Sequence, residues 1–129
     1  MRRGAAIVGN DRVVIEDEIE ARPGTEAVWG MHTDAAVNLR GQRAVLTLGK
    51  DNLYVDLLEP KDAAWHVQEV SLAKPQNPVK NTRKLTANVK TSAQPSRICI
   101  LFSVQERQPG TSPAVLPLRQ WSNQGVLAR

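Results

Sequence analysis

The chain has 129 residues, and its 41% hydrophobic and 23% charged content are the values of an ordinary globular protein. No apolar run approaches the ~20 residues of a membrane-spanning helix, and the basic start MRRG is followed by too short an apolar stretch for a signal peptide. The net charge of +4 suits an anionic partner, but the few aromatic residues disfavour a nucleic-acid-binding protein. We expect one domain at residues 1–121 and a frayed tail at residues 122–129.

Apolar and polar residues alternate with a period of two along most of the chain, as in strands that are buried on one side. Gly, Pro, Asn or Asp separates the alternating runs, as between strands joined by hairpins. At residues 48–52, either a positive φ at Gly49 or a left-handed Asp51 would make the turn. The pattern predicts an antiparallel β-sandwich of about eight short strands with an irregular C-terminal tail. The expected strands are residues 12–21, 26–33, 43–49, 52–58, 63–70, 84–91 and 97–104, with residues 114–121 as a proline-containing edge strand.

Charged residues interrupt the first of these runs. Asp17 falls on the apolar face, where a carboxylate costs several kcal/mol unless it is paired or hydrogen-bonded. We therefore expect it at the rim of the sheet, or bound by backbone amides or an arginine. Glu16, Glu18 and Glu20 fall on the opposite face, which we interpret as solvated. Cys99 lies inside the run ICILF and is expected to be a buried thiol that packs as a small hydrophobe.

The two histidines are the first candidates for chemistry. His32 and Asp34 share a strand face, but a separation of about 7 Å is too long for a direct hydrogen bond. His32, His66, Asp34 and Cys99 are possible metal ligands, yet no CxxC, HxH or HExxH spacing is present. We predict no catalytic residue, no metal site and no cofactor. The favoured interpretation of His32 is a half-buried imidazole that fixes strand register through a hydrogen bond.

The order of motifs resembles the C-terminal β-sandwich portion of heparinase II/III-like polysaccharide lyases. The motifs are a strand with a central Asp, a W-x-x-H-T strand, a hairpin ending in GK, an L-x-x-P-x-x-A-x-W segment and a late P-L-x-x-W. The resemblance covers residues 3–121. The matching residues are Asp17, Trp29, His32, Thr33, Ala44, Leu46, Gly49, Lys50, Leu57, Pro60, Ala63, Trp65, Pro117, Leu118 and Trp121.

In that family the activity is β-elimination of uronic-acid polysaccharides, and it depends on a helical toroid and a His-rich segment that carries a catalytic histidine and zinc ligands. Nothing in this sequence matches either part, and Tyr54 matches no catalytic motif. The resemblance therefore implies a non-catalytic sandwich segment that supports the catalytic domains, in a periplasmic or secreted protein. It implies contact with those missing domains, or a homodimer through an exposed sheet, and no membrane partner.

The alternative is a stand-alone binding module for acidic polysaccharide. His32 and Arg40 are the candidate substrate-binding residues of the chain.

Overall fold

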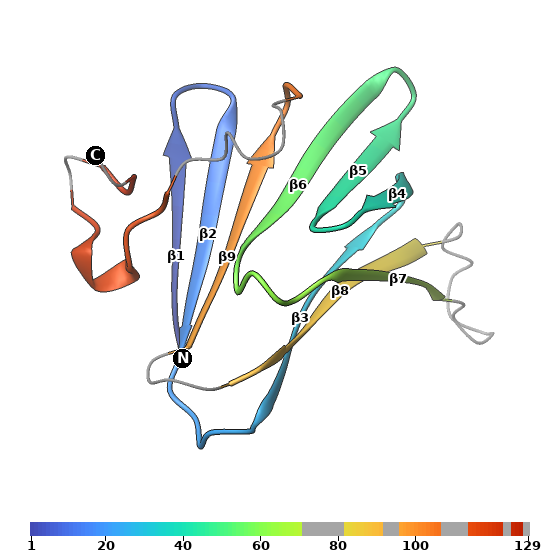
Figure 1. The fold of residues 1–129 in the computed structure, drawn as a ribbon. Helices are drawn as coiled ribbons and strands as arrows, with labels where there is room; N and C mark the ends of the chain where they lie inside the picture. Colours follow the sequence, from blue (N-terminus) through green and yellow to red (C-terminus); the bar gives the residue numbers. More distant parts are fainter. Residues whose placement is uncertain (71–81, 92–95, 107–113, 123–124, 128–129) are drawn as a thin grey trace, which may run out of the picture.

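Two antiparallel sheets form the fold of the computed structural model, which describes residues 1–70, 82–91, 96–106, 114–122 and 125–127 (Figure 1). Sheet A has the strand order β1-β2-β9-β6-β5-β4, and sheet B has the order β3-β8-β7. This confirms the predicted all-β, antiparallel sandwich. No helix in the described residues is long and apolar enough to cross a membrane. The strands are β1 (Arg2–Val8), β2 (Arg12–Ile19), β3 (Glu26–Thr33), β4 (Ala36–Arg40), β5 (Arg43–Leu48), β6 (Asp51–Glu59), β7 (Trp65–Val70), β8 (Thr82–Lys90) and β9 (Ser96–Ser103).

Two strands of sheet A, β1 and β4, were not expected from the sequence. Both are edge strands, and each pairs with the next strand along the chain through a short turn. The sequence of β1, RRGAAIV, has small residues at its centre and so shows little alternation. The turn between β5 and β6 uses Gly49 at φ 63°, while Asp51 begins β6.

The C-terminal segment differs from its prediction in one respect. Residues 114–121 form no edge strand, because Pro117 has no N–H for a ladder and the chain turns there into a short 3-10 helix, η1 (Leu118–Gln120). Within the expected tail, Val126 is 7% exposed and its carbonyl accepts a bond from the Leu116 N–H at 2.8 Å. The other residues of the expected tail, 123–124 and 128–129, lie outside the described part.

The main hydrophobic core lies between the two sheets. Trp29 of β3 and Trp65 of β7 meet edge to face, with ring centroids 5.6 Å apart, and Trp29 also lies 6.5 Å from Phe102 of β9. The Trp65 indole donates to the Val55 carbonyl at 3.1 Å. This core contains Trp29, Ala35, Ala44, Leu46, Val55, Leu57, Ala63, Trp65, Leu85, Ala87, Val89, Ile98 and Ile100.

Sheet B leaves part of the core-facing side of sheet A uncovered. Figure 1 shows sheet B on the side of β4 and β6 and away from β1. The register places Ala5 beside Ile15 and Ile7 beside Val13, and Ile15 in turn faces Ile100 of the core. Ala5 is exposed, Ile7 is 77% exposed, and Val13 and Ile15 are half-buried. We call these four residues the uncovered patch.

Candidate functional site

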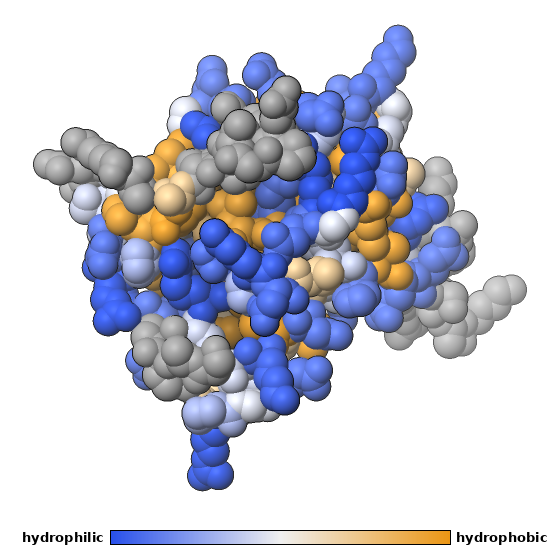
Figure 2. Space-filling view, viewed as in Figure 1, coloured by the Kyte–Doolittle hydropathy of each residue, from blue (hydrophilic) through white to orange (hydrophobic). Residues whose placement is uncertain are grey.

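The other face of sheet A, which we call its outer face, is covered by the C-terminal segment. Residues 114–122 and 125–127, here called the strap, lie over β1, β2 and β9, and apolar surface gathers at this side of the molecule (Figure 2). Trp121 packs there and donates from its indole to the Leu116 carbonyl at 2.9 Å, so that it anchors the strap. A second, smaller hydrophobic cluster lies beneath the strap: Val14, Cys99 and Leu101, with Val8, Leu58, Val115 and Trp121 packed against it.

A buried carboxylate lies under the strap. Glu16 is fully buried and Glu18 is 7% exposed, so the prediction of a solvated face at these two residues is wrong. The reason is the strap above Glu16 and a partner from β9: the Arg97 guanidinium donates to Oε1 of Glu16 through Nε at 2.8 Å and also through Nη2. The other oxygen, Oε2, is buried and finds no partner among the described residues.

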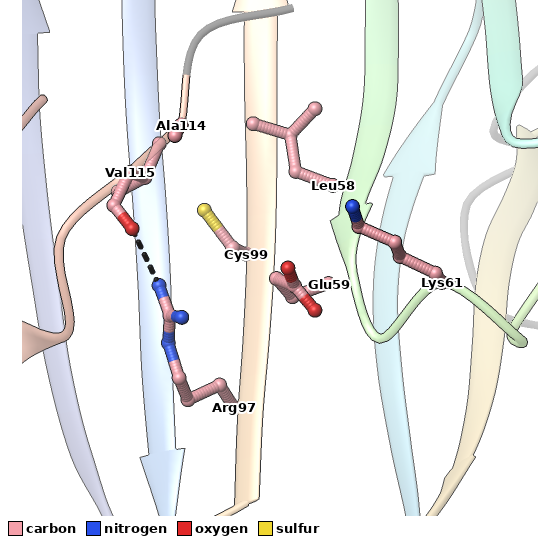
Figure 3. A pocket seen from close by; sticks show the side chains of 7 residues that line it. All are labelled: Leu58, Glu59, Lys61, Arg97, Cys99, Ala114 and Val115. Atoms are coloured by element: carbon pink, nitrogen blue, oxygen red, sulfur yellow. Dashed lines mark hydrogen bonds between the residues drawn. The ribbon is translucent and has the colours of Figure 1, made fainter. Parts of the chain in front are cut away.

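Beside this pair, a cavity of about 320 Å³ lies between the strap and sheet A. The register places Cys99 between Glu16 of β2 and Glu59 of β6. Figure 3 shows the Cys99 thiol between the strap on one side and the end of β6 on the other. The cavity is lined by Leu58, Glu59, Lys61, Arg97, Cys99, Ala114 and Val115.

The cavity places a buried thiol beside charged side chains, of which Arg97 is paired with Glu16. Cys99 is fully buried, as predicted, and burial raises the pKa of its thiol to about 12, with the negative charge of Glu16 adding to the shift. A nucleophilic or metal-binding cysteine must be a thiolate. At neutral pH Cys99 is therefore protonated and unreactive while the strap is in place.

Two further arginine–carboxylate pairs are built into sheet A. Asp17 accepts two bonds from Arg3, at 2.6 and 2.7 Å, and this confirms the prediction that an arginine or another donor binds its carboxylate. On the outer face, Asp56 accepts two bonds from Arg43, at 2.7 and 3.2 Å. The Arg43 guanidinium also lies 5.7 Å from the centre of the Tyr54 ring. Each pair links two neighbouring strands, and we interpret both pairs as structural.

The structure does not bring the predicted site residues together. His32 is exposed on the outer face of sheet B opposite Lys84, and no hydrogen bond to its ring occurs in the described part of the chain, so the half-buried, hydrogen-bonded imidazole is a wrong prediction. His32 points away from the core because Trp29, Met31 and Thr33 alternate with it. Arg40 lies at the far end of β4 in sheet A, where its guanidinium is 3.7 Å from Glu106.

The two histidines nevertheless share one surface. His66 of β7 pairs with Thr86 of β8, next to Lys84, so that His32, Lys84 and His66 all lie on the outer face of sheet B. No group of three or more His, Cys, Asp or Glu side chains within the described ranges could hold a metal ion. The binding roles of His32 and Arg40 stay predictions.

The sequence did not predict that Glu16, Arg97, Glu59 and Lys61 lie close together around Cys99. One signal was present: residues 97–104 are apolar on both faces, which indicates that the second face of this strand is also covered. The residue opposite Cys99 on the neighbouring strand would then be buried as well. Which residue that is depends on the pairing of β2 with β9, between segments about 80 positions apart.

Comparison of the chain with models of known protein families and with curated proteins gives no match.

The raised pKa of Glu16 predicts an unusual pH dependence of stability. Burial raises the pKa of this carboxyl, although Arg97 opposes the shift. The folded state therefore holds the proton more tightly than the unfolded chain, whose glutamate pKa is about 4.3. Consequently the contribution of Glu16 to the free energy of unfolding is fully present below that pH and falls as the pH rises through the raised pKa.

Glu16→Gln keeps an oxygen for Arg97 but has no charge to titrate. We expect the unfolding free energy of the wild type, relative to this variant, to fall as the pH is raised from about 4 to 7. Urea unfolding at a series of pH values measures this difference. Glu20→Gln makes the same charge change at an exposed position of the same segment and is the matched control variant. A flat or rising difference for Glu16→Gln would contradict the prediction.

Proposed function

We propose that this chain is a non-catalytic β-sandwich unit of a heparinase II/III-like polysaccharide lyase, in which it supports the catalytic part. The observation that carries the proposal is that many residues matching the lyase motifs lie in the hydrophobic core. Six of them, Trp29, Ala44, Leu46, Leu57, Ala63 and Trp65, belong to the core between the sheets.

Other residues that match the lyase motifs stabilise turns or make hydrogen bonds within the fold. Thr33 accepts a bond from the Ala35 N–H at 3.0 Å at the β3–β4 connection, and the Pro60 carbonyl accepts a bond from the Ala63 N–H at 3.3 Å in the turn after β6. Gly49 makes the β5–β6 turn, and Asp17 is bound by Arg3. Because these residues stabilise the fold, they support a β-sandwich shared with the lyases. In this proposal another region carries the catalytic residues, and the protein is periplasmic or secreted.

The uncovered patch supports contact with such a region. Ile7 and Ala5 expose apolar surface on the side of sheet A that sheet B leaves free, next to half-buried Val13 and Ile15. Monomeric proteins rarely leave large contiguous apolar surface in water. In this proposal the catalytic part of the lyase packs on the uncovered patch.

The test uses activity and association together. The purified chain is assayed for unsaturated uronate with heparin, alginate and hyaluronate, alone and after co-expression with a helical-toroid protein encoded in the flanking DNA. We expect no product from the chain alone, and co-purification that Ile7→Asp disrupts. Val28→Asp is the matched control, since Val28 is 60% exposed but lies on β3 outside the patch. Cleavage by the chain alone, or the lack of any such coding sequence or complex, would overturn the proposal.

The second candidate function is a stand-alone module for acidic polysaccharide. The shared position of His32, Lys84 and His66 on the outer face of sheet B favours it, because an ammonium and two imidazoles on one surface can donate hydrogen bonds to the anionic groups of such a glycan. Salt-sensitive retention of the chain on heparin, lost in His32→Ala and Lys84→Ala, would favour this function. Arg40→Ala, on the other sheet, tests the second predicted binding residue.

A further inference from the structure

The strap is joined to sheet A by side chains. Its backbone bonds within the described residues run between members of the strap: Leu116 to Val126, Gln120 to Pro117 and Trp121 to Leu118. The bridges Val115–Leu127 and Ser122–Gly125 are also internal to the strap. None of these bonds belongs to a ladder with a strand of the sheet. The strap is thus a small unit with its own backbone pairing. It packs on the face of sheet A and does not extend the sheet.

Besides the hydrophobic cluster beneath the strap, two further contacts within the described residues hold this unit in place. The Arg97 guanidinium, already bound to Glu16, donates from Nη2 to the Val115 carbonyl at 2.9 Å (Figure 3). Leu118 and Trp121 lie directly over Gly4 of β1, so closely that a Cβ at residue 4 would lie 2.6 Å from the indole carbon Cζ3 and would also overlap Leu118. The absence of a side chain at residue 4 is therefore what lets the strap lie flat.

The strap also packs on a different hydrophobic cluster from the main core. The cluster beneath it lies on the opposite face of sheet A from the core between the sheets. The cavity of about 320 Å³ beside Cys99 means that the strap is not closely packed along its whole length. Segments with few packed contacts open at lower free energy than the cooperative core of a protein.

We propose that the strap lifts from sheet A as a unit while both sheets stay folded, and that this opening uncovers Cys99, Val14 and Leu101. The strap is then a cover that controls access to the outer face of sheet A. The strap and the uncovered patch lie on opposite faces of sheet A. The proposed opening of the strap therefore does not depend on the proposed function.

Cys99 reports the opening directly, because it is the only cysteine of the chain and is fully buried beneath the strap. Alkylation of the whole chain by iodoacetamide is measured at increasing urea concentrations below the unfolding transition. Local opening exposes little surface and gives a rate with weak urea dependence, whereas global unfolding gives the full dependence of the equilibrium transition. We expect the weakly dependent pathway to dominate in dilute urea.

Two glycine variants test the role of the strap. Gly4→Ala places a methyl group against Leu118 and Trp121 and should accelerate alkylation in dilute urea roughly tenfold or more, as overpacking predicts. Gly30→Ala is the matched control: it also adds a methyl group to an edge strand, but its nearest neighbour is the flexible end of Lys84 at 3.1 Å. We expect its alkylation rate to stay within about twofold of the wild type.

Trp121→Ala is the second strap variant and should accelerate alkylation by removing the anchor, even where Gly4→Ala does not fold. The proposal is overturned if alkylation of the wild type follows global unfolding at every urea concentration. It is also overturned if both strap variants accelerate alkylation only in proportion to their loss of global stability.

Discussion

Replacing Trp29 by alanine is expected to lower the free energy of unfolding by about 3–5 kcal/mol, the usual cost of deleting a large aromatic side chain from a core. Trp29 is 7% exposed and contacts both Trp65 and Phe102, so its loss opens a cavity between the two sheets. Two strands, β7 and β9, would lose the packing partner that β3 provides. Urea unfolding followed by circular dichroism measures the change.

Trp29→Phe separates packing from hydrogen bonding. The Trp29 indole nitrogen is buried and finds no acceptor among the described residues, so phenylalanine removes volume without breaking a bond. We expect a loss of about 1–2 kcal/mol for this variant. Trp65→Phe should cost more than Trp29→Phe, because the Trp65 indole donates to the Val55 carbonyl. A Trp29→Ala variant as stable as the wild type would refute the assignment of Trp29 to the core.

The period-two pattern predicts strands where one face meets the core and the other meets water. β3 shows why: Trp29 and Met31 pack inward while Gly30 and His32 point outward. The same pattern carries no information about β1, whose central residues are Gly and Ala, because β1 is held by its ladder with β2 and by the strap over Gly4. Alternation therefore reports a difference in side-chain character between the two faces of a strand, and β1, with Gly and Ala at its centre, shows too little of it.

The candidate site was less predictable than the fold because it depends on long-range pairing. Glu16 looks like a solvated residue in its own segment, and only Arg97, 81 positions later, makes its burial tolerable. Asp17 was easier, since a carboxylate on an apolar face demands a partner whatever that partner is. The sequence can thus indicate that a buried charge needs compensation, but the residue that provides it follows from strand order.

Arg43 and Asp56 offer the sharpest test of such compensation. Their side chains are 10% and 11% exposed, and they are joined by two hydrogen bonds between β5 and β6. Arg43→Met leaves the Asp56 carboxylate buried without its partner, which typically costs about 3–5 kcal/mol. We expect a loss of that size in the free energy of unfolding, measured by urea denaturation at pH 7.

The double variant Arg43→Met with Asp56→Leu removes both charges and should recover most of this loss, because well-packed apolar residues often replace a buried pair at little cost. Arg40→Met is the control in the same hairpin: the Arg40–Glu106 pair is 59% and 57% exposed, and exposed pairs contribute less than about 1 kcal/mol. If Arg43→Met and Arg40→Met cost the same, burial does not determine the strength of the Arg43–Asp56 pair. If the double variant is as unstable as Arg43→Met, the loss comes from packing of the arginine side chain on Tyr54 and not from the unpaired carboxylate.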